Sequence, residues 1–130
     1  MKKNRNITDS ELEILQILWD KGPSTVRTIH ESLSNMKQTG YTTTLKLMQI
    51  MFEKGILTRD DSARTHIYAA AVTESFGQKQ ALHKIIDSVF KGSPTKLVMQ
   101  ALGHYKPTHK EIEEIKAYLE GLEGSDFKEQ

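Results

Sequence analysis

The segment from Gly40 to Tyr68 constrains the fold most, because a helical pattern in it leads directly into two strand-like patterns. Residues 42–54 have the apolar spacing of a helix that buries one side, and Gly55 follows where a left-handed C-cap is needed. Residues 56–59 and 65–68 are rich in β-branched and aromatic side chains and are separated by the polar residues 60–64. A helix followed by a β-hairpin is therefore predicted. The expected buried side of the helix comprises Leu45, Leu47, Met48, Met51 and Phe52.

Two shorter helices are predicted ahead of this segment. Thr8 and Glu11 form a capping box, which predicts a helix start, and Gly22 followed by proline ends that helix. Ser24 is expected to cap the second helix. Three helices followed by a hairpin is the order of a winged helix-turn-helix, so residues 7–72 are predicted to form this domain in a mainly α chain with a small β-hairpin.

Three further helices are predicted from residue 73 onward. Thr73 and Ser93 are placed to cap the first two, which Gly92 and Gly103 are expected to end, and Thr108 opens the third. Their apolar positions include Leu82, Ile85, Ile86, Val89, Leu97, Val98, Ile112, Ile115, Leu119 and Leu122. The last four step by three, four and three residues, which is the spacing of a coiled-coil seam. Because three small helices cannot bury so much apolar surface alone, residues 73–122 are predicted to be a three-helix dimerisation domain.

The third helix of a winged helix commonly enters the major groove of double-stranded DNA, and the side chains here suit that role. Threonine hydroxyls can contact phosphates, lysine attracts them, and glutamine can pair with adenine. The predicted DNA-binding residues are Thr42, Thr43, Thr44, Lys46 and Gln49, with Arg64 contacting DNA from the hairpin. Trp19 and Tyr41 are expected to belong to the core instead.

Composition argues against several other kinds of protein. The chain has no cysteine, which removes thiolate chemistry and fits a reducing compartment, and no apolar run approaches the ~20 residues of a membrane span. We therefore expect a cytoplasmic protein without membrane insertion. His104 and His109 are separated by Pro107 and do not share a helix face, so no metal site is predicted. No catalytic constellation and no cofactor motif is present, and an enzyme is not expected.

Several of these motifs together resemble one family over about residues 7–122. They are residues 12–19 (LEILQILW), residues 41–44 (YTTT), residues 53–55 (EKG) and residues 66–68 (HIY). This combination resembles the penicillinase-repressor (BlaI/MecI) family of winged-helix regulators. The resemblance implies a homodimeric transcriptional repressor that binds a dyad operator through its third helix, with its carboxy-terminal helices forming the dimer.

The resemblance also implies a mode of induction, from which this sequence departs. In penicillinase-type members a membrane-embedded zinc-metalloprotease sensor triggers cleavage of an Asn-Phe bond in the dimerisation helices. The matching residues here are Gln100 and Ala101. The copper-responsive relatives carry a cysteine-rich tail, which this chain lacks. A basic residue often found late in the third helix is replaced by Ile50.

Two other functions agree with the same residues. A winged helix can dock onto a protein partner with the face that would otherwise meet DNA, and binding to duplex DNA separates these alternatives. The chain could also be a DNA-binding regulator gated by a small molecule held among its methionine and aromatic side chains. The sequence leaves the operator, the regulated genes and the inducing signal open.

Overall fold

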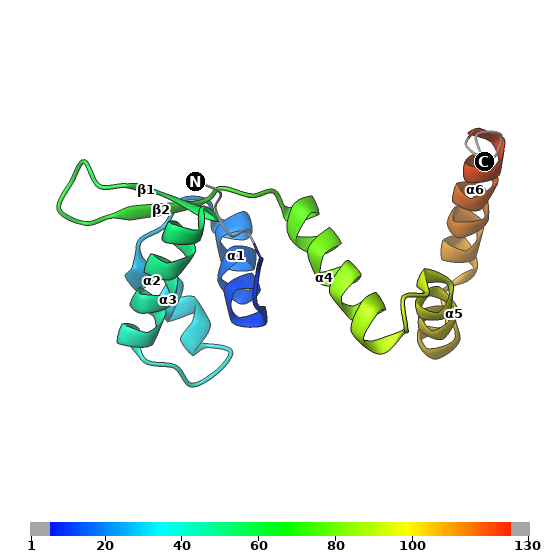
Figure 1. Cartoon of the computed structure of the whole chain (residues 1–130), viewed down its shortest axis with the longest axis horizontal. Coiled ribbons are helices and arrows are strands. Elements are labelled where there is room, and N and C mark those ends of the chain that lie inside the picture. The colour runs from blue at the N-terminus through cyan, green and yellow to red at the C-terminus, as the bar shows by residue number, and fades with distance from the viewer. Residues whose placement is uncertain (1–5, 126–130) are drawn as a thin grey trace. The chain divides into compact units, whose positions relative to one another are not determined.

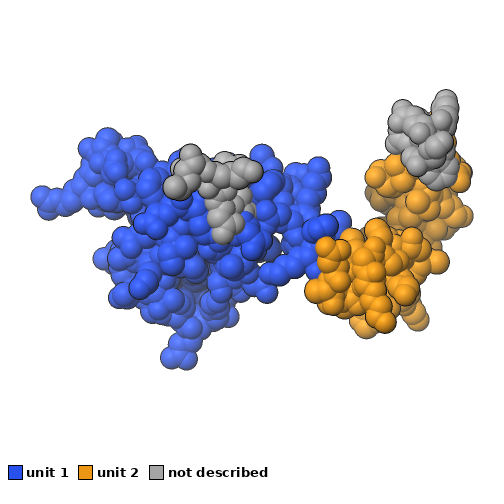
Figure 2. Space-filling view, viewed as in Figure 1, with its two compact units in different colours: residues 1–84 blue, residues 85–130 orange. Residues whose placement is uncertain are grey.

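The computed structural model describes residues 6–125 of the 130-residue chain. Its elements are α1 (Asp9–Lys21), α2 (Val26–Ser34), α3 (Tyr41–Lys54), β1 (Leu57–Asp60), β2 (Ile67–Ala70), α4 (Glu74–Val89), α5 (Pro94–Tyr105) and α6 (His109–Ser125). The predicted fold class is confirmed: the chain is mainly helical, and one hairpin follows the third helix (Figure 1). The chain divides into two compact units, of which the first reaches Lys84 and the second begins at Ile85 (Figure 2).

Local capping signals place most helix ends correctly. The Thr8 hydroxyl accepts a hydrogen bond from the Glu11 N–H at 3.2 Å, and the Glu11 carboxylate accepts from the Thr8 N–H at 3.0 Å. A second capping box at Thr108 begins α6 in the same way, and Ser93 caps α5. Gly55 has φ 86°, which is the left-handed conformation expected at the end of α3.

Two predicted helix ends are wrong. Thr25 rather than Ser24 caps α2, because the backbone of Ser24 is paired with that of Tyr68 in both directions, at 2.8 and 2.9 Å. This bridge ties the start of α2 to the hairpin. The other error concerns α5, which continues past Gly103 and ends where Lys106 adopts a positive φ of 45°.

The core of the first unit lies among α1, α2, α3 and the hairpin. It is formed by Ile7, Ile14, Leu15, Leu18, Val26, Ile29, Leu33, Met48, Met51, Ile56, Leu57, Tyr68 and Val72. The strands pair antiparallel from Leu57 opposite Ala70 to Asp60 opposite Ile67, and the residues between them extend away from the helices (Figure 1). Burying Leu57 and Tyr68 therefore fixes the base of the hairpin against α3.

The first unit continues beyond residue 72, because the beginning of α4 packs on α1. Gly77 is buried against the Trp19 ring, and the Ile7 N–H donates to the Gln80 side-chain oxygen at 3.1 Å. These contacts join residues distant in sequence. They place residues 73–84 with the winged helix rather than with the helices after them.

The second unit comprises the end of α4 together with α5 and α6, and none of its described side chains is fully buried. Ile86, Leu97 and Ile115 are half-buried. The other apolar positions predicted for dimerisation are exposed: Leu82 in the first unit, and Ile85, Val89, Val98, Ile112, Leu119 and Leu122 in the second. Over residues 6–125, no helix combines the length and apolar character required to cross a bilayer.

Candidate nucleic-acid interface

The α3 helix has one polar exposed side and one buried side. Thr42, Thr43, Lys46 and Gln49 are exposed, and they recur at the three- and four-residue spacing of a single helix face. The opposite side buries Met48 and Met51, while Leu45, Leu47 and Phe52 are half-buried beside the core. Four of the five side chains predicted on this helix therefore share a surface that is open to a partner.

The structure corrects the predicted role of Thr44 in the interface. Its side chain belongs to the buried side of α3, is only 1% exposed, and donates its hydroxyl hydrogen to the Gly40 carbonyl at 3.3 Å. The prediction that it contacts DNA is wrong, because consecutive positions on a helix point about 100° apart and Thr44 points inward. Tyr41 is the reverse case. It was expected in the core but is 45% exposed, with its ring edge-to-face against His30 at 5.7 Å.

A groove of about 410 Å³ lies beside the exposed face of α3. Its lining comes from the start of α2, from α3 as far as Gln49 and from the second side of the hairpin: Thr25, Val26, Arg27, Tyr41, Leu45, Gln49, Arg64, Thr65, His66 and Tyr68. The groove brings together Gln49 and Arg64, both of which were predicted to bind DNA. Sequence reasoning missed Arg27 and His66 as members of this site, because only the folded hairpin brings them to it.

Most charged side chains of the hairpin interact with neighbouring residues of the protein. The Arg59 guanidinium lies over the Phe52 ring at 4.2 Å and pairs with Asp61 at 3.4 Å. A side-chain hydrogen bond with Tyr68 raises the pKa of Arg59 above its ordinary value. The Ser62 N–H donates to Asp60 at 3.0 Å, and this backbone hydrogen bond lowers the pKa of that carboxyl. Arg59 thus braces the hairpin on α3, whereas Arg64 is exposed near its tip.

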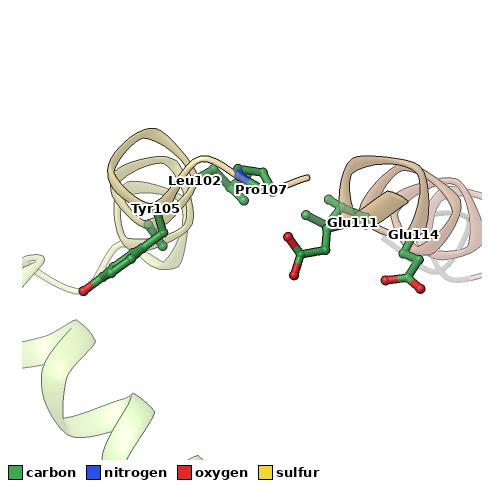
Figure 3. A pocket seen from close by; sticks show the side chains of 7 residues that line it. Leu102, Tyr105, Pro107, Glu111 and Glu114 are labelled. Atoms are coloured by element: carbon green, nitrogen blue, oxygen red, sulfur yellow. The ribbon is translucent and has the colours of Figure 1, made fainter. Parts of the chain in front are cut away.

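The second unit has its own hollow, of about 450 Å³, between α5 and α6. Figure 3 shows Leu102 and Tyr105 of α5 and Glu111 and Glu114 of α6 around it, with Pro107 in the connection. Glu111 is already engaged, because it accepts a hydrogen bond from the Thr108 N–H at 2.8 Å. Among the described residues no group of three histidine or carboxylate side chains is placed to hold a metal ion.

Comparison with known proteins relates this architecture to one family. The family model described as penicillinase repressor matches residues 7–121. The chain is 23% identical to the penicillinase repressor of Bacillus licheniformis over 120 residues, which is 92% of this chain and 94% of that protein. It is 26% identical to the methicillin resistance regulatory protein MecI of Staphylococcus aureus (strain N315) over 117 residues, which is 90% of this chain and 95% of that protein.

A solved structure is similar to the amino-terminal part of this one. It is the solution structure of the DNA-binding domain of the repressor BlaI, with a TM-score of 0.52 and 25% sequence identity, covering 58% of this chain and 92% of that one. The chain belongs to the penicillinase repressor (BlaI/MecI) family of transcriptional repressors, which are not enzymes and whose DNA-binding domain is a winged helix.

Proposed function

We propose that this protein is a cytoplasmic, homodimeric transcriptional repressor that binds a dyad operator through α3. Residues 7–72 would contact double-stranded DNA, and residues 73–122 would join two copies. The observation that carries the proposal is the polar exposed side of α3, which stands beside an open groove and a braced hairpin. A helix of this diameter with short polar side chains fits the major groove of B-DNA.

Individual side chains have distinct roles in this proposal. Thr42 and Thr43, at the start of α3, would donate hydroxyl hydrogens to phosphates, while Lys46 and Gln49 would reach the groove and the adjoining phosphates. Arg64 would contact the backbone from the hairpin. Since Thr44 is buried, its side chain supports α3 rather than DNA.

Dimerisation through the carboxy-terminal helices is supported by their exposed apolar side chains. Ile112, Leu119 and Leu122 are exposed on α6, and Ile115 beside them is half-buried, at the spacing of a seam. A partner copy would remove this surface from water. Dimerisation would also raise operator affinity, because the second half-site, about 34 Å along the duplex, is then captured intramolecularly.

We further propose that a signal relieves repression by causing the protein to be cleaved. Gln100 and Ala101 are exposed within α5, so a membrane metalloprotease sensor system could reach this region. Proteases bind extended substrates, so one turn of α5 would have to unwind before cleavage. Cutting there would divide the helices assigned to the dimer and thereby weaken operator binding.

Fluorescence anisotropy tests the function directly. The protein is titrated against duplexes tiling the region upstream of its own gene, at near-physiological salt, with a scrambled duplex as the control. Tight binding to one dyad-containing fragment, weakened steeply by salt, is the expected result. Equal weak binding to every duplex would instead favour a protein-interaction winged helix or a regulator that needs a small molecule.

A further inference from the structure

The groove between α2, α3 and the hairpin contains basic side chains from separate parts of the chain. Arg27 comes from the first turn of α2, and Arg64 and His66 come from the residues leading into β2. The described residues that line the groove include no aspartate or glutamate. Arg27, Arg64 and His66 are also exposed at their outer ends. The groove therefore offers positive charge on facing walls to an anionic group entering from solvent.

The groove also carries hydroxyl and apolar side chains. Thr25 and Thr65 add hydroxyl groups along its walls, while Val26 and Leu45 supply apolar surface. The Thr25 hydroxyl already accepts a hydrogen bond from the Thr28 N–H and donates one to the Thr28 hydroxyl, so the arginine side chains must provide the main attraction. Gln49 of the proposed DNA-reading face lines the same groove, which makes the groove continuous with that face.

We propose that this groove binds the phosphodiester backbone of the operator, with Arg27 and His66 as phosphate contacts on its two walls. The inference rests on the proposed function and adds two DNA-binding residues to it. Arg27 would contact the backbone from α2 and His66 from the hairpin, on either side of the segment that α3 reads. These contacts orient the duplex without reading its sequence.

The acidic side chains of the hairpin do not compete for these groups. Asp60 accepts a hydrogen bond from the Ser62 N–H, and Asp61 pairs with Arg59. Arg27, Arg64 and His66 therefore stay available to a phosphate in the groove.

The test measures the affinity of single variants for DNA and the salt dependence of that affinity. The probes are the tightest-binding duplex from the upstream region and a random-sequence duplex of equal length, because phosphate contacts persist on both. For Arg27→Ala, the slope of log affinity against log salt should become shallower by about 1 per bound protomer on both probes. Lys110→Ala, which removes an exposed lysine from α6, is the matched control and should keep the wild-type slope.

For His66→Ala, the affinity for both probes should fall several-fold because a phosphate contact is lost, whereas His109→Ala, at the start of α6, should bind as wild type. Circular dichroism checks that each variant is folded. If the wild type binds its upstream duplex but Arg27→Ala keeps the wild-type salt slope, or His66→Ala keeps the wild-type affinity, the groove is not a backbone site while the repressor function stands. If the wild type binds no duplex, both proposals are overturned.

Discussion

A Cβ atom at Gly77 of α4 would lie 2.7 Å from Cη2 of Trp19 on α1. The indole cannot swing away freely, because its N–H donates to the Val72 carbonyl at 3.0 Å and its ring packs against the core. Only glycine therefore lets the beginning of α4 approach α1 this closely, and this contact keeps residues 73–84 with the winged helix.

Gly77→Ala should consequently destabilise the protein. Overpacking against the indole costs about 1–3 kcal/mol, and the better helix propensity of alanine offsets up to about 1 kcal/mol of it. Urea unfolding followed by circular dichroism at one protein concentration measures the change. Gly103→Ala in α5 is the control, because nothing lies within 4 Å of its added Cβ, and it should be neutral or stabilising. If the Gly77→Ala protein is as stable as the wild type, the Trp19 ring can move aside at little cost in free energy.

The second prediction concerns the buried ion pair between Glu11 and Lys54, which lie 2.7 Å apart. The Glu11 side chain is only 3% exposed, so Lys54→Met leaves a carboxylate in the core without its cation. We expect a loss of about 2 kcal/mol in the free energy of unfolding, below the full cost of a broken buried pair because Lys54 is partly accessible. Adding Glu11→Gln should restore much of this, since glutamine can still complete the Thr8 capping box. Equal stability of the single and double variants would contradict this account.

The third prediction separates two neighbouring threonines on α3. Thr44→Val removes a buried hydroxyl that donates to the Gly40 carbonyl, so it should cost about 1 kcal/mol of stability and leave the DNA affinity of the folded protein unchanged. Thr43→Val, on the exposed side, should leave stability unchanged and weaken operator binding several-fold. Thermal unfolding and anisotropy on the same two proteins measure both effects. If Thr43→Val lowered stability and Thr44→Val weakened DNA binding instead, the exposed and buried sides of α3 would be assigned wrongly.

These cases show which features could be predicted from sequence. The capping boxes at Thr8 and Thr108 and the left-handed Gly55 were predictable because they depend on residues within one turn. The helix order and the hairpin followed from periodicity, and the comparisons support the resulting fold. Thr44 was misassigned because its polar side chain was given more weight than its helix phase, although it stands four residues before Met48 and seven before Met51, both predicted to be buried.

Contacts distant in sequence account for the remaining differences. Ser24 was a reasonable cap for α2 until the hairpin folded back and paired with its backbone through Tyr68. The packing of Gly77 on Trp19 has no local signal either. Arg27 and His66 likewise meet in one groove only once the hairpin is in place.

The fourth prediction tests the proposed dimer. Leu119→Glu places a charge on the exposed apolar seam of α6 and should convert the protein to monomers at concentrations where the wild type is dimeric. Sedimentation velocity measures the oligomeric state. Ala117→Glu adds the same charge to α6 away from the seam and should remain dimeric. If Leu119→Glu also remains dimeric, the predicted seam does not hold the dimer.

The central claim is that the exposed side of α3 binds the operator, and Lys46→Ala tests it most directly. Fluorescence anisotropy on the dyad-containing duplex, repeated over a range of salt concentrations, should show weaker binding. The salt dependence should also become shallower by about 1 in log–log slope for each bound protomer. Lys110→Ala should behave as wild type. A folded Lys46→Ala protein with wild-type affinity and wild-type salt dependence would contradict the account and exclude this lysine from the interface.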